Sequence, residues 1–200
     1  MPIFRSAHYS GKRVAALTTD LNSGQYLWIA FEKDSTDNCR ILKVSAQDLT
    51  QIYFDVDIEV DAIKTLLINS TSLYVGVDDP VNYIYKFAVA NPLIAPTIIA
   101  LPAGVVEAPV DVVNDGAGYF WWLFPGLSGE IAKIVKTTNT GTFQQTITLQ
   151  QSAVEVHNAI SIVYRSGDLW VVTNESPANL IRVHLVSGVW TFNVTPLVTT

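Results

Sequence analysis

Four carboxylates alternate with apolar residues in one short stretch of the sequence, Asp55-Val56-Asp57-Ile58-Glu59-Val60-Asp61. On a β-strand, this alternation places every carboxylate on the same face. The four are Asp55, Asp57, Glu59 and Asp61. Hard oxygen ligands suit Ca²⁺ or Mg²⁺, so one prediction is a cation site on this face. The alternative is a solvated strand edge whose charges prevent edge-to-edge aggregation.

Three glutamates recur at equal spacing. Glu59, Glu107 and Glu155 follow one another at intervals of 48 residues, each after an apolar residue. Equal spacing predicts equivalent places in a repeating fold, where three carboxylates would form an acidic rim for a cation or a basic partner. The alternative is a repeated structural role, such as accepting backbone N–H groups in the connections between repeats.

Basic residues also recur, at Lys43, Lys86, Lys133 and Arg182. One interpretation is that these four basic residues form an anion site. Equivalent places in successive repeats would instead spread them round the fold. We therefore expect them to lay their aliphatic stems along neighbouring apolar surface and to meet carboxylates.

A dense aromatic segment runs from Tyr119 to Pro125. Trp121 aligns with aromatic residues of other repeats and is expected in the core. Trp122 and Phe124 are the candidates for an exposed interaction surface, either a subunit contact or a platform that stacks on a glycan.

Catalytic groups are poorly represented. The histidines His8, His157 and His184 have no visible nucleophile or metal-binding partner, and the sequence lacks a Gly-rich phosphate loop and a GxSxG motif. We therefore expect a protein that is not an enzyme and has no cofactor, apart from Ca²⁺ or Mg²⁺ if the acidic rim forms.

The elements that would position these residues repeat four times. Apolar cores begin at Leu27, Leu73, Phe120 and Leu169, spaced by 46, 47 and 49 residues. Each core is preceded by a strand-like run, expected at Ala62–Ile68 in the second repeat, and by an Asn-, Asp- or Gly-containing turn. Two further strand-like runs follow each core, with the first expected at Ile131–Ile134 in the third repeat and the second at Thr97–Leu101 in the second repeat. No window shows a helical period.

The repeat unit is therefore four antiparallel strands, close in length to a propeller blade. The sequence predicts an all-β, β-propeller-like array of four blades forming a single domain over residues 1–200. The blades are expected at about 10–57, 58–105, 106–153 and 154–200. A β-sandwich would not explain a four-fold repeat. Four blades either close alone, with both chain ends tied into one blade, or form an open array that needs a partner chain.

The last repeat resembles the YVTN/NHL type of β-propeller repeat. It runs from Leu169 to Asn174, continues with Leu180-Ile181-Arg182-Val183, and ends in the turn Ser187-Gly188. The family pattern is a strand ending near Thr-Asn, then Ile-x-Arg/Lys-Val and a Gly turn. The resemblance implies a fold rather than an activity. Some YVTN-like propellers are lyases that use His, Glu and Mg²⁺. In this sequence, only the pair Glu155 and His157 resembles those catalytic groups.

Composition limits the partners. The net charge is −6, with 15% charged residues and no basic cluster, so nucleic acid is not expected as a partner. Cys39 is the single cysteine, which excludes an internal disulfide. No apolar run is long enough to span a membrane. The sequence from Met1 to Ser6 lacks the apolar region of a signal peptide.

These observations favour a non-enzymatic structural or interaction propeller within a symmetric assembly, as a homo-oligomer or part of a larger complex. We expect a virion setting, as a capsid- or tail-associated phage component, with the cytoplasm as the alternative. A glycan- or ligand-binding module and a cation-dependent lyase or hydrolase are the other functions to weigh.

Overall fold

The computed structural model describes residues 13–20, 24–33, 38–79 and 84–197. The two chain ends, whose attachment to a sheet was expected, lie outside these residues, as does His8. The chain divides into two compact units, residues 1–99 and 100–200, and each is described by itself. Whether they form the expected single domain stays a prediction.

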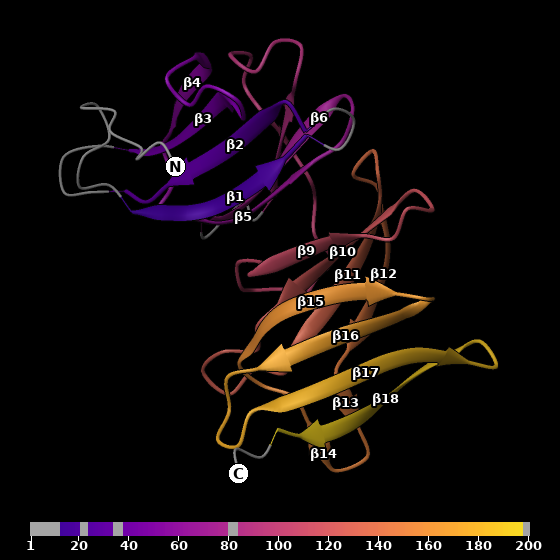
Figure 1. The fold of residues 1–200 in the computed structure, drawn as a ribbon. Helices are drawn as coiled ribbons and strands as arrows, with labels where there is room; N and C mark the ends of the chain where they lie inside the picture. The colour runs from indigo at the N-terminus through magenta and orange to yellow at the C-terminus, as the bar shows by residue number, and fades with distance from the viewer. Residues whose placement is uncertain (1–12, 21–23, 34–37, 80–83, 198–200) are drawn as a thin grey trace. The chain divides into compact units, whose positions relative to one another are not determined.

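The first unit contains two four-stranded antiparallel sheets whose strands follow chain order (Figure 1). The first sheet consists of β1 (Val14–Thr19), β2 (Tyr26–Phe31), β3 (Cys39–Ser45) and β4 (Ile52–Ile58). The second sheet consists of β5 (Ala62–Ile68), β6 (Ser72–Asp78), β7 (Ile84–Ala88) and β8 (Thr97–Ile98).

The second unit contains two more four-stranded antiparallel sheets and a short two-stranded one. The third sheet consists of β9 (Asp111–Asn114), β10 (Tyr119–Phe124), β11 (Lys133–Thr138) and β12 (Phe143–Thr148). β13 (Gln150–Gln151) pairs with β14 (Val154–Glu155). The fourth sheet consists of β15 (Ala159–Arg165), β16 (Asp168–Thr173), β17 (Asn179–Val186) and β18 (Val189–Pro196). The expected all-β class with four-stranded antiparallel units is therefore observed.

Turn chemistry explains the tightest connections. β15 and β16 are joined by Ser166-Gly167, with φ of 54° and 90°. β17 and β18 are joined in the same way by Ser187-Gly188, with φ of 49° and 82°. Two successive positive φ values match the right-handed twist of the flanking strands, which is why two-residue hairpins favour them.

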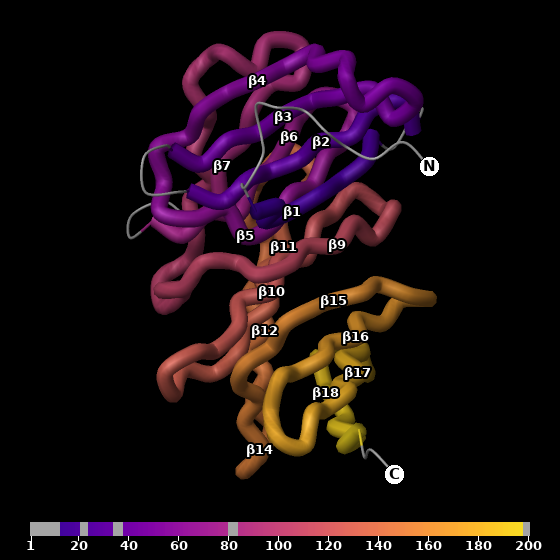
Figure 2. Tube along the Cα trace, turned by 60° about the vertical axis from the view of Figure 1, so that its left-hand side comes forward, coloured from indigo at the N-terminus to yellow at the C-terminus, as the bar shows by residue number. Residues whose placement is uncertain are grey.

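In the first unit, the core lies between the two sheets. Side chains of the first sheet, including Trp28 and Ile41, form one buried cluster with Leu73 and Val75 of the second sheet. The first strands β1 and β5 lie side by side (Figure 2). The two first strands are therefore neighbours in space although they belong to separate sheets.

The second unit is built in the same way. Trp121 and Leu123 of β10 share a buried cluster with Leu169 and Val171 of β16. β9 and β15 are the neighbouring first strands. Each sheet therefore buries one face against the sheet that follows or precedes it in the same unit.

Three expected strand ranges differ from the structure. The acidic strand stops at Ile58, although exposed and less exposed residues continue to alternate through Asp61. The fourth strand of the second sheet, expected from Thr97 to Leu101, ends at Ile98. β11 begins at Lys133 rather than Ile131. Ala132 instead bonds to segments outside the sheet, donating its N–H to Val156 and accepting that of Leu149.

In the described part of the chain, no helix is both long and apolar enough to cross a membrane.

Candidate functional site

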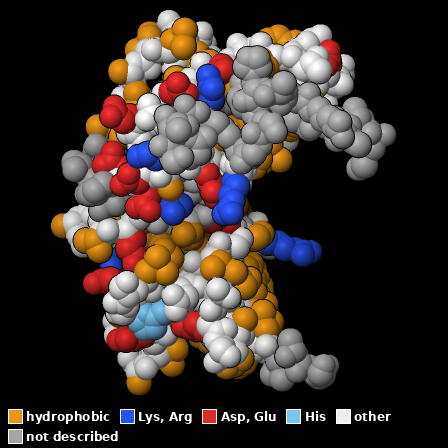
Figure 3. Space-filling view, turned by 90° about the vertical axis from the view of Figure 1, so that its left-hand side faces the viewer, with side chains coloured by type: hydrophobic (Ala, Val, Ile, Leu, Met, Phe, Trp, Pro, Cys, Tyr) orange, Lys and Arg blue, Asp and Glu red, His pale blue; other side chains and the backbone are white. Residues whose placement is uncertain are grey.

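The acidic stretch is bridged by the protein's own cations. Arg40 Nε lies 2.6 Å from Asp55 Oδ1 and 3.3 Å from Asp57 Oδ1. Lys33 Nζ lies 3.6 Å from Asp61 Oδ1. On the face shown in Figure 3, acidic side chains lie beside Lys and Arg side chains in the same manner. Three of the four carboxylates of this stretch, Asp55, Asp57 and Asp61, thus meet basic side chains of the chain itself.

Glu107 fixes the loop that follows β10 by accepting two backbone hydrogen bonds. Its Oε2 accepts the N–H of Gly126 at 2.8 Å, and its Oε1 accepts that of Leu127 at 2.6 Å. Gly126 has a φ of 70°, and a Cβ there would lie 2.3 Å from the backbone nitrogen of Ala132. A tight turn with no room for a side chain is therefore fixed by a carboxylate 19 residues upstream. Glu107 therefore accepts backbone N–H groups, which is the structural role predicted as the alternative to a cation site.

Glu155 lies on β14 and is exposed. Gln150 Nε2 donates to Glu155 Oε1 at 2.7 Å, and His157 Nε2 lies 3.6 Å from Glu155 Oε2. The other ring nitrogen of His157 meets the carbonyl of Glu130. Both ring nitrogens of His157 thus face groups of the local framework.

The three equally spaced glutamates differ in their surroundings. Glu59 belongs to the first unit, whereas Glu107 and Glu155 belong to the second. Among the residues that the structure describes, no three His, Cys, Asp or Glu side chains gather closely enough to hold a metal ion. The acidic rim, its cation and the chemistry of a lyase or hydrolase stay predictions.

A cross-strand pair of an aromatic and a basic residue recurs in every four-stranded sheet. The aromatic residue lies on the second strand, and the basic residue lies directly opposite it on the third. The pairs are Trp28 with Lys43, Tyr74 with Lys86, Trp121 with Lys136, and Trp170 with Arg182. In each pair the cation lies 4.7–5.7 Å from the centre of the aromatic ring. These are cation–π distances.

The third sheet corrects the basic series read from the sequence. Lys136, not Lys133, faces Trp121. Lys133 lies opposite Phe124 and pairs with Glu130 at 3.6 Å. The sequence alignment gave the last three repeats the same step from the core to the basic residue. In the structure, the connection between the second and third strands is longer in the third sheet than in the second and fourth. Arg182 lies over an aromatic ring and also meets a carboxylate, with one guanidinium nitrogen 2.6 Å from Asp168 Oδ2. Lys43 and Lys86 lie over aromatic rings as well, and their expected carboxylate partners stay a prediction.

Trp122 and Phe124, expected on an exposed surface, are buried. Their relative exposures are 0% and 2%. Both project from β10, which lies between β9 and β11. Trp122 Nε1 donates to Thr137 Oγ1 at 3.1 Å, so even its polar atom is satisfied inside the protein. Neither side chain offers a free platform for a glycan.

Comparison with known proteins supports the fold. No protein-family model matches the sequence, and no curated protein does. Solved structures do resemble it. Hydrazine synthase from Kuenenia stuttgartiensis matches with a TM-score of 0.66 at 12% identity, over 92% of this chain and 54% of that one. Prolyl endopeptidase matches with a TM-score of 0.57 at 14% identity, over 92% of this chain and 27% of that one.

The β-propeller domain of Cps50 (Swd1) from Myceliophteria thermophila matches with a TM-score of 0.52 at 14% identity. The match covers 86% of this chain and 51% of that one. This chain therefore spans about half the length of the hydrazine synthase and Cps50 chains. At these identities the likeness concerns fold alone: the protein has a β-propeller-like, all-β fold. The YVTN/NHL repeat type is a finer assignment than these matches carry.

Proposed function

We propose that the protein is a non-catalytic interaction module of the β-propeller type, and that it joins an assembly through the outer face of its fourth sheet. The observation that carries the proposal is the partly exposed pair of Trp170 and Arg182 on that sheet. The proposal extends the propeller-like fold to a role that the fold alone does not specify.

The aromatic–cation side of a sheet is the side on which the next sheet packs. Trp28 lies in the cluster that the first sheet forms with the second. Trp121 lies in the cluster that the third sheet forms with the fourth, and its ring centre is 5.4 Å from that of Trp190 on β18. Both tryptophans are buried, with exposures of 0% and 2%.

In the fourth sheet the same side has no following sheet within its unit. Leu169 and Val171 face the third sheet, so Trp170 between them points to the opposite face. We call this the terminal face. It comprises Val163, Trp170, Val172, Leu180, Arg182 and His184. Val163, directly opposite Trp170 on β15, is 55% exposed, and Trp170 itself is partly exposed.

A face with this pattern fits another sheet of the same kind. The occupant we propose is a sheet from a second copy of the chain, which makes the assembly a homo-oligomer or part of a larger symmetric complex. Low charge and abundant Thr, Ser, Asn and Gln support a virion as the setting. Mass spectrometry of particles released by lysis of the source cells tests that setting, and detection of the chain among cytoplasmic proteins alone would contradict it.

Size-exclusion chromatography with light scattering tests the assembly. We expect the wild-type chain to elute as an oligomer and Val163→Glu to shift it towards monomer. Leu185→Glu is the matched control, because Leu185 is 54% exposed on β17 but points away from the terminal face, as the residue next to His184. A wild-type monomer at every concentration, or equal effects of the two variants, would overturn the proposal. Glycan-array binding by such a monomer would favour the glycan-binding alternative.

A further inference from the structure

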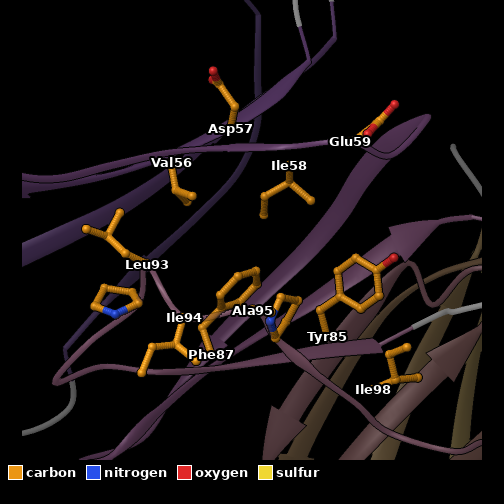
Figure 4. A pocket seen from close by; sticks show the side chains of 12 residues that line it. Val56, Asp57, Ile58, Glu59, Tyr85, Phe87, Leu93, Ile94, Ala95 and Ile98 are labelled. Carbon is orange, nitrogen blue, oxygen red and sulfur yellow. The ribbon is translucent and has the colours of Figure 1, made fainter.

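A groove lies along β4 in the residue 1–99 unit, lined mostly by apolar residues, with Asp57 and Glu59 also among its lining residues. Its volume is about 340 Å³, and its lining comes from β4, β7 and the segment 92–98. Figure 4 shows Val56 and Ile58 of β4 pointing into the space, with Phe87 of β7 on the other side. Asp57 and Glu59 project from the opposite side of β4 (Figure 4).

The groove exists because the outer strand of the second sheet is short. β8 has two residues, whereas β4 has seven. An apolar segment precedes β8 and forms one wall of the groove. In this wall, Leu93 is 74% exposed and Ile94 is 61% exposed. Neighbouring large apolar side chains at such exposure indicate a contact surface.

β4 is an open edge. It pairs with β3, and no described strand pairs with its other side. The backbone N–H and C=O groups of such an edge can pair with an added strand. Alternate side chains of an added strand would point into the groove and towards the carboxylate face, because the period of a strand is two residues.

The carboxylate face carries an excess of negative charge. Arg40 bridges Asp55 and Asp57, and Lys33 meets Asp61. Among the described residues, these two basic side chains meet three of the four carboxylates. Glu59 is exposed and forms no ion pair with a described residue. Opposite charges on neighbouring strands stabilise a sheet, and like charges destabilise it.

We propose that β4 binds an extended peptide segment of a basic partner protein as an added strand. The segment alternates apolar residues, which enter the groove, with Lys or Arg residues, which lie beside Asp57 and Glu59. A second copy of this acidic edge would bring like charges together, and the whole chain carries a net charge of −6, so the partner is a different protein. The site lies in the other unit from the terminal face, so either proposal can fail without the other.

The probe is a fluorescent peptide of seven residues in which Val and Lys alternate, matched in length to β4. We expect it to bind the full-length protein in fluorescence anisotropy. A peptide of the same composition with its lysines in one block should bind about tenfold more weakly, because its apolar side chains no longer share a face. Equal binding of both peptides would reduce the effect to general charge attraction and overturn the proposal.

N-methylation of the probe tests strand addition directly. An added strand uses alternate N–H groups to pair with its neighbour. Methylating one alternate set of nitrogens should abolish binding, and methylating the other set should leave it unchanged. Unchanged binding whichever of the two sets of nitrogens is methylated would contradict pairing with the β4 edge.

Protein variants locate the site. Glu59→Lys should weaken binding of the alternating peptide about threefold to tenfold, and Glu32→Lys, the same change at another exposed position in the unit, should not. Ile94→Ser should also weaken binding, whereas Leu185→Ser, at 54% exposure in the other unit, should leave it unchanged. Unaltered urea unfolding shows that each variant is folded. Wild-type affinity in folded Glu59→Lys and Ile94→Ser would overturn the proposal.

Discussion

Lys136 lies directly across the β10–β11 ladder from Trp121, and its ammonium group is 4.7 Å from the centre of the indole ring. The same ammonium lies 3.7 Å from the ring centre of Tyr119. Two aromatic faces therefore share one cation, and its aliphatic stem covers part of both rings. Lys43 has the same arrangement in the first sheet, at 4.0 Å from Tyr26 and 5.4 Å from Trp28.

Replacing Lys136 by Met should lower the free energy of unfolding by about 0.5–1.5 kcal/mol, because a partly desolvated cation–π contact is lost. Lys133→Met should cost less than about 0.5 kcal/mol, because the partner of Lys133 is the exposed carboxylate of Glu130. Urea unfolding of the two variants measures the difference. A larger cost at Lys133 would show that the paired lysine had been assigned wrongly.

Two fully buried tryptophans differ in whether the indole N–H has a hydrogen-bond partner. Trp28 Nε1 has no hydrogen-bond partner among the described residues, whereas Trp122 Nε1 donates to the buried Thr137 Oγ1 at 3.1 Å. Trp→Phe at either position leaves a comparable cavity. At position 122 the change also leaves the buried hydroxyl of Thr137 without its hydrogen-bond donor. Trp122→Phe should therefore destabilise the protein by about 1 kcal/mol more than Trp28→Phe. Thermal and urea unfolding compare them, and equal costs would contradict the assigned hydrogen bond.

Glu107 provides a test that separates a loop clamp from a cation ligand. Glu107→Ala should lower the free energy of unfolding by about 1–3 kcal/mol, because it leaves the N–H groups of Gly126 and Leu127 without their acceptor. The loss should be the same with EDTA, Ca²⁺ or Mg²⁺. Glu155→Ala, at an exposed position, is the control. A loss that appears only with added cation would restore the cation site.

Cys39 should be unreactive in the folded protein. Its side chain is fully buried, and burial raises the pKa of its thiol, so the reactive thiolate is disfavoured. We expect thiol reagents to label it in denaturant and not in native buffer. Labelling of the native chain at the unfolded rate would contradict its burial.

The same shift makes stability depend on pH. The folded state keeps a proton that the unfolded chain releases, so the free energy of unfolding should fall as the pH rises above the ordinary thiol pKa of 9.0. Cys39→Ala should lose this part of the alkaline dependence. An unchanged alkaline slope in the variant would assign the dependence to other groups.

Local patterns predicted the strands well because they depend on neighbouring residues. The sequence placed the first strand of the second sheet at Ala62–Ile68, and β5 has these bounds. It also placed the Ser187-Gly188 turn correctly, since two-residue hairpins need positive φ. Burial of alternate residues from Asp55 to Asp61 follows the predicted alternation too.

Long-range partners could not be predicted in this way. The register that pairs Trp121 with Lys136 goes with a long β10–β11 connection, and part of that connection is held by Glu107, which lies far upstream. The burial of Trp122 likewise depends on its place on a central strand rather than on its own sequence neighbours. Arg40, which bridges Asp55 and Asp57, gave no local signal because it lies on another strand.

The fourth sheet ends in a strand with a practical consequence for handling the protein. β18 pairs with β17, and no other described strand pairs with it. Across Val189–Pro196 it carries no Asp, Glu, Lys or Arg. Unlike β4, it has no charge to repel a neighbouring molecule, and Pro196 interrupts only its last position. Concentrated preparations should therefore aggregate first through this edge. A single lysine in place of Val194, which is 37% exposed and points away from the terminal face, is the economical route to a more soluble protein.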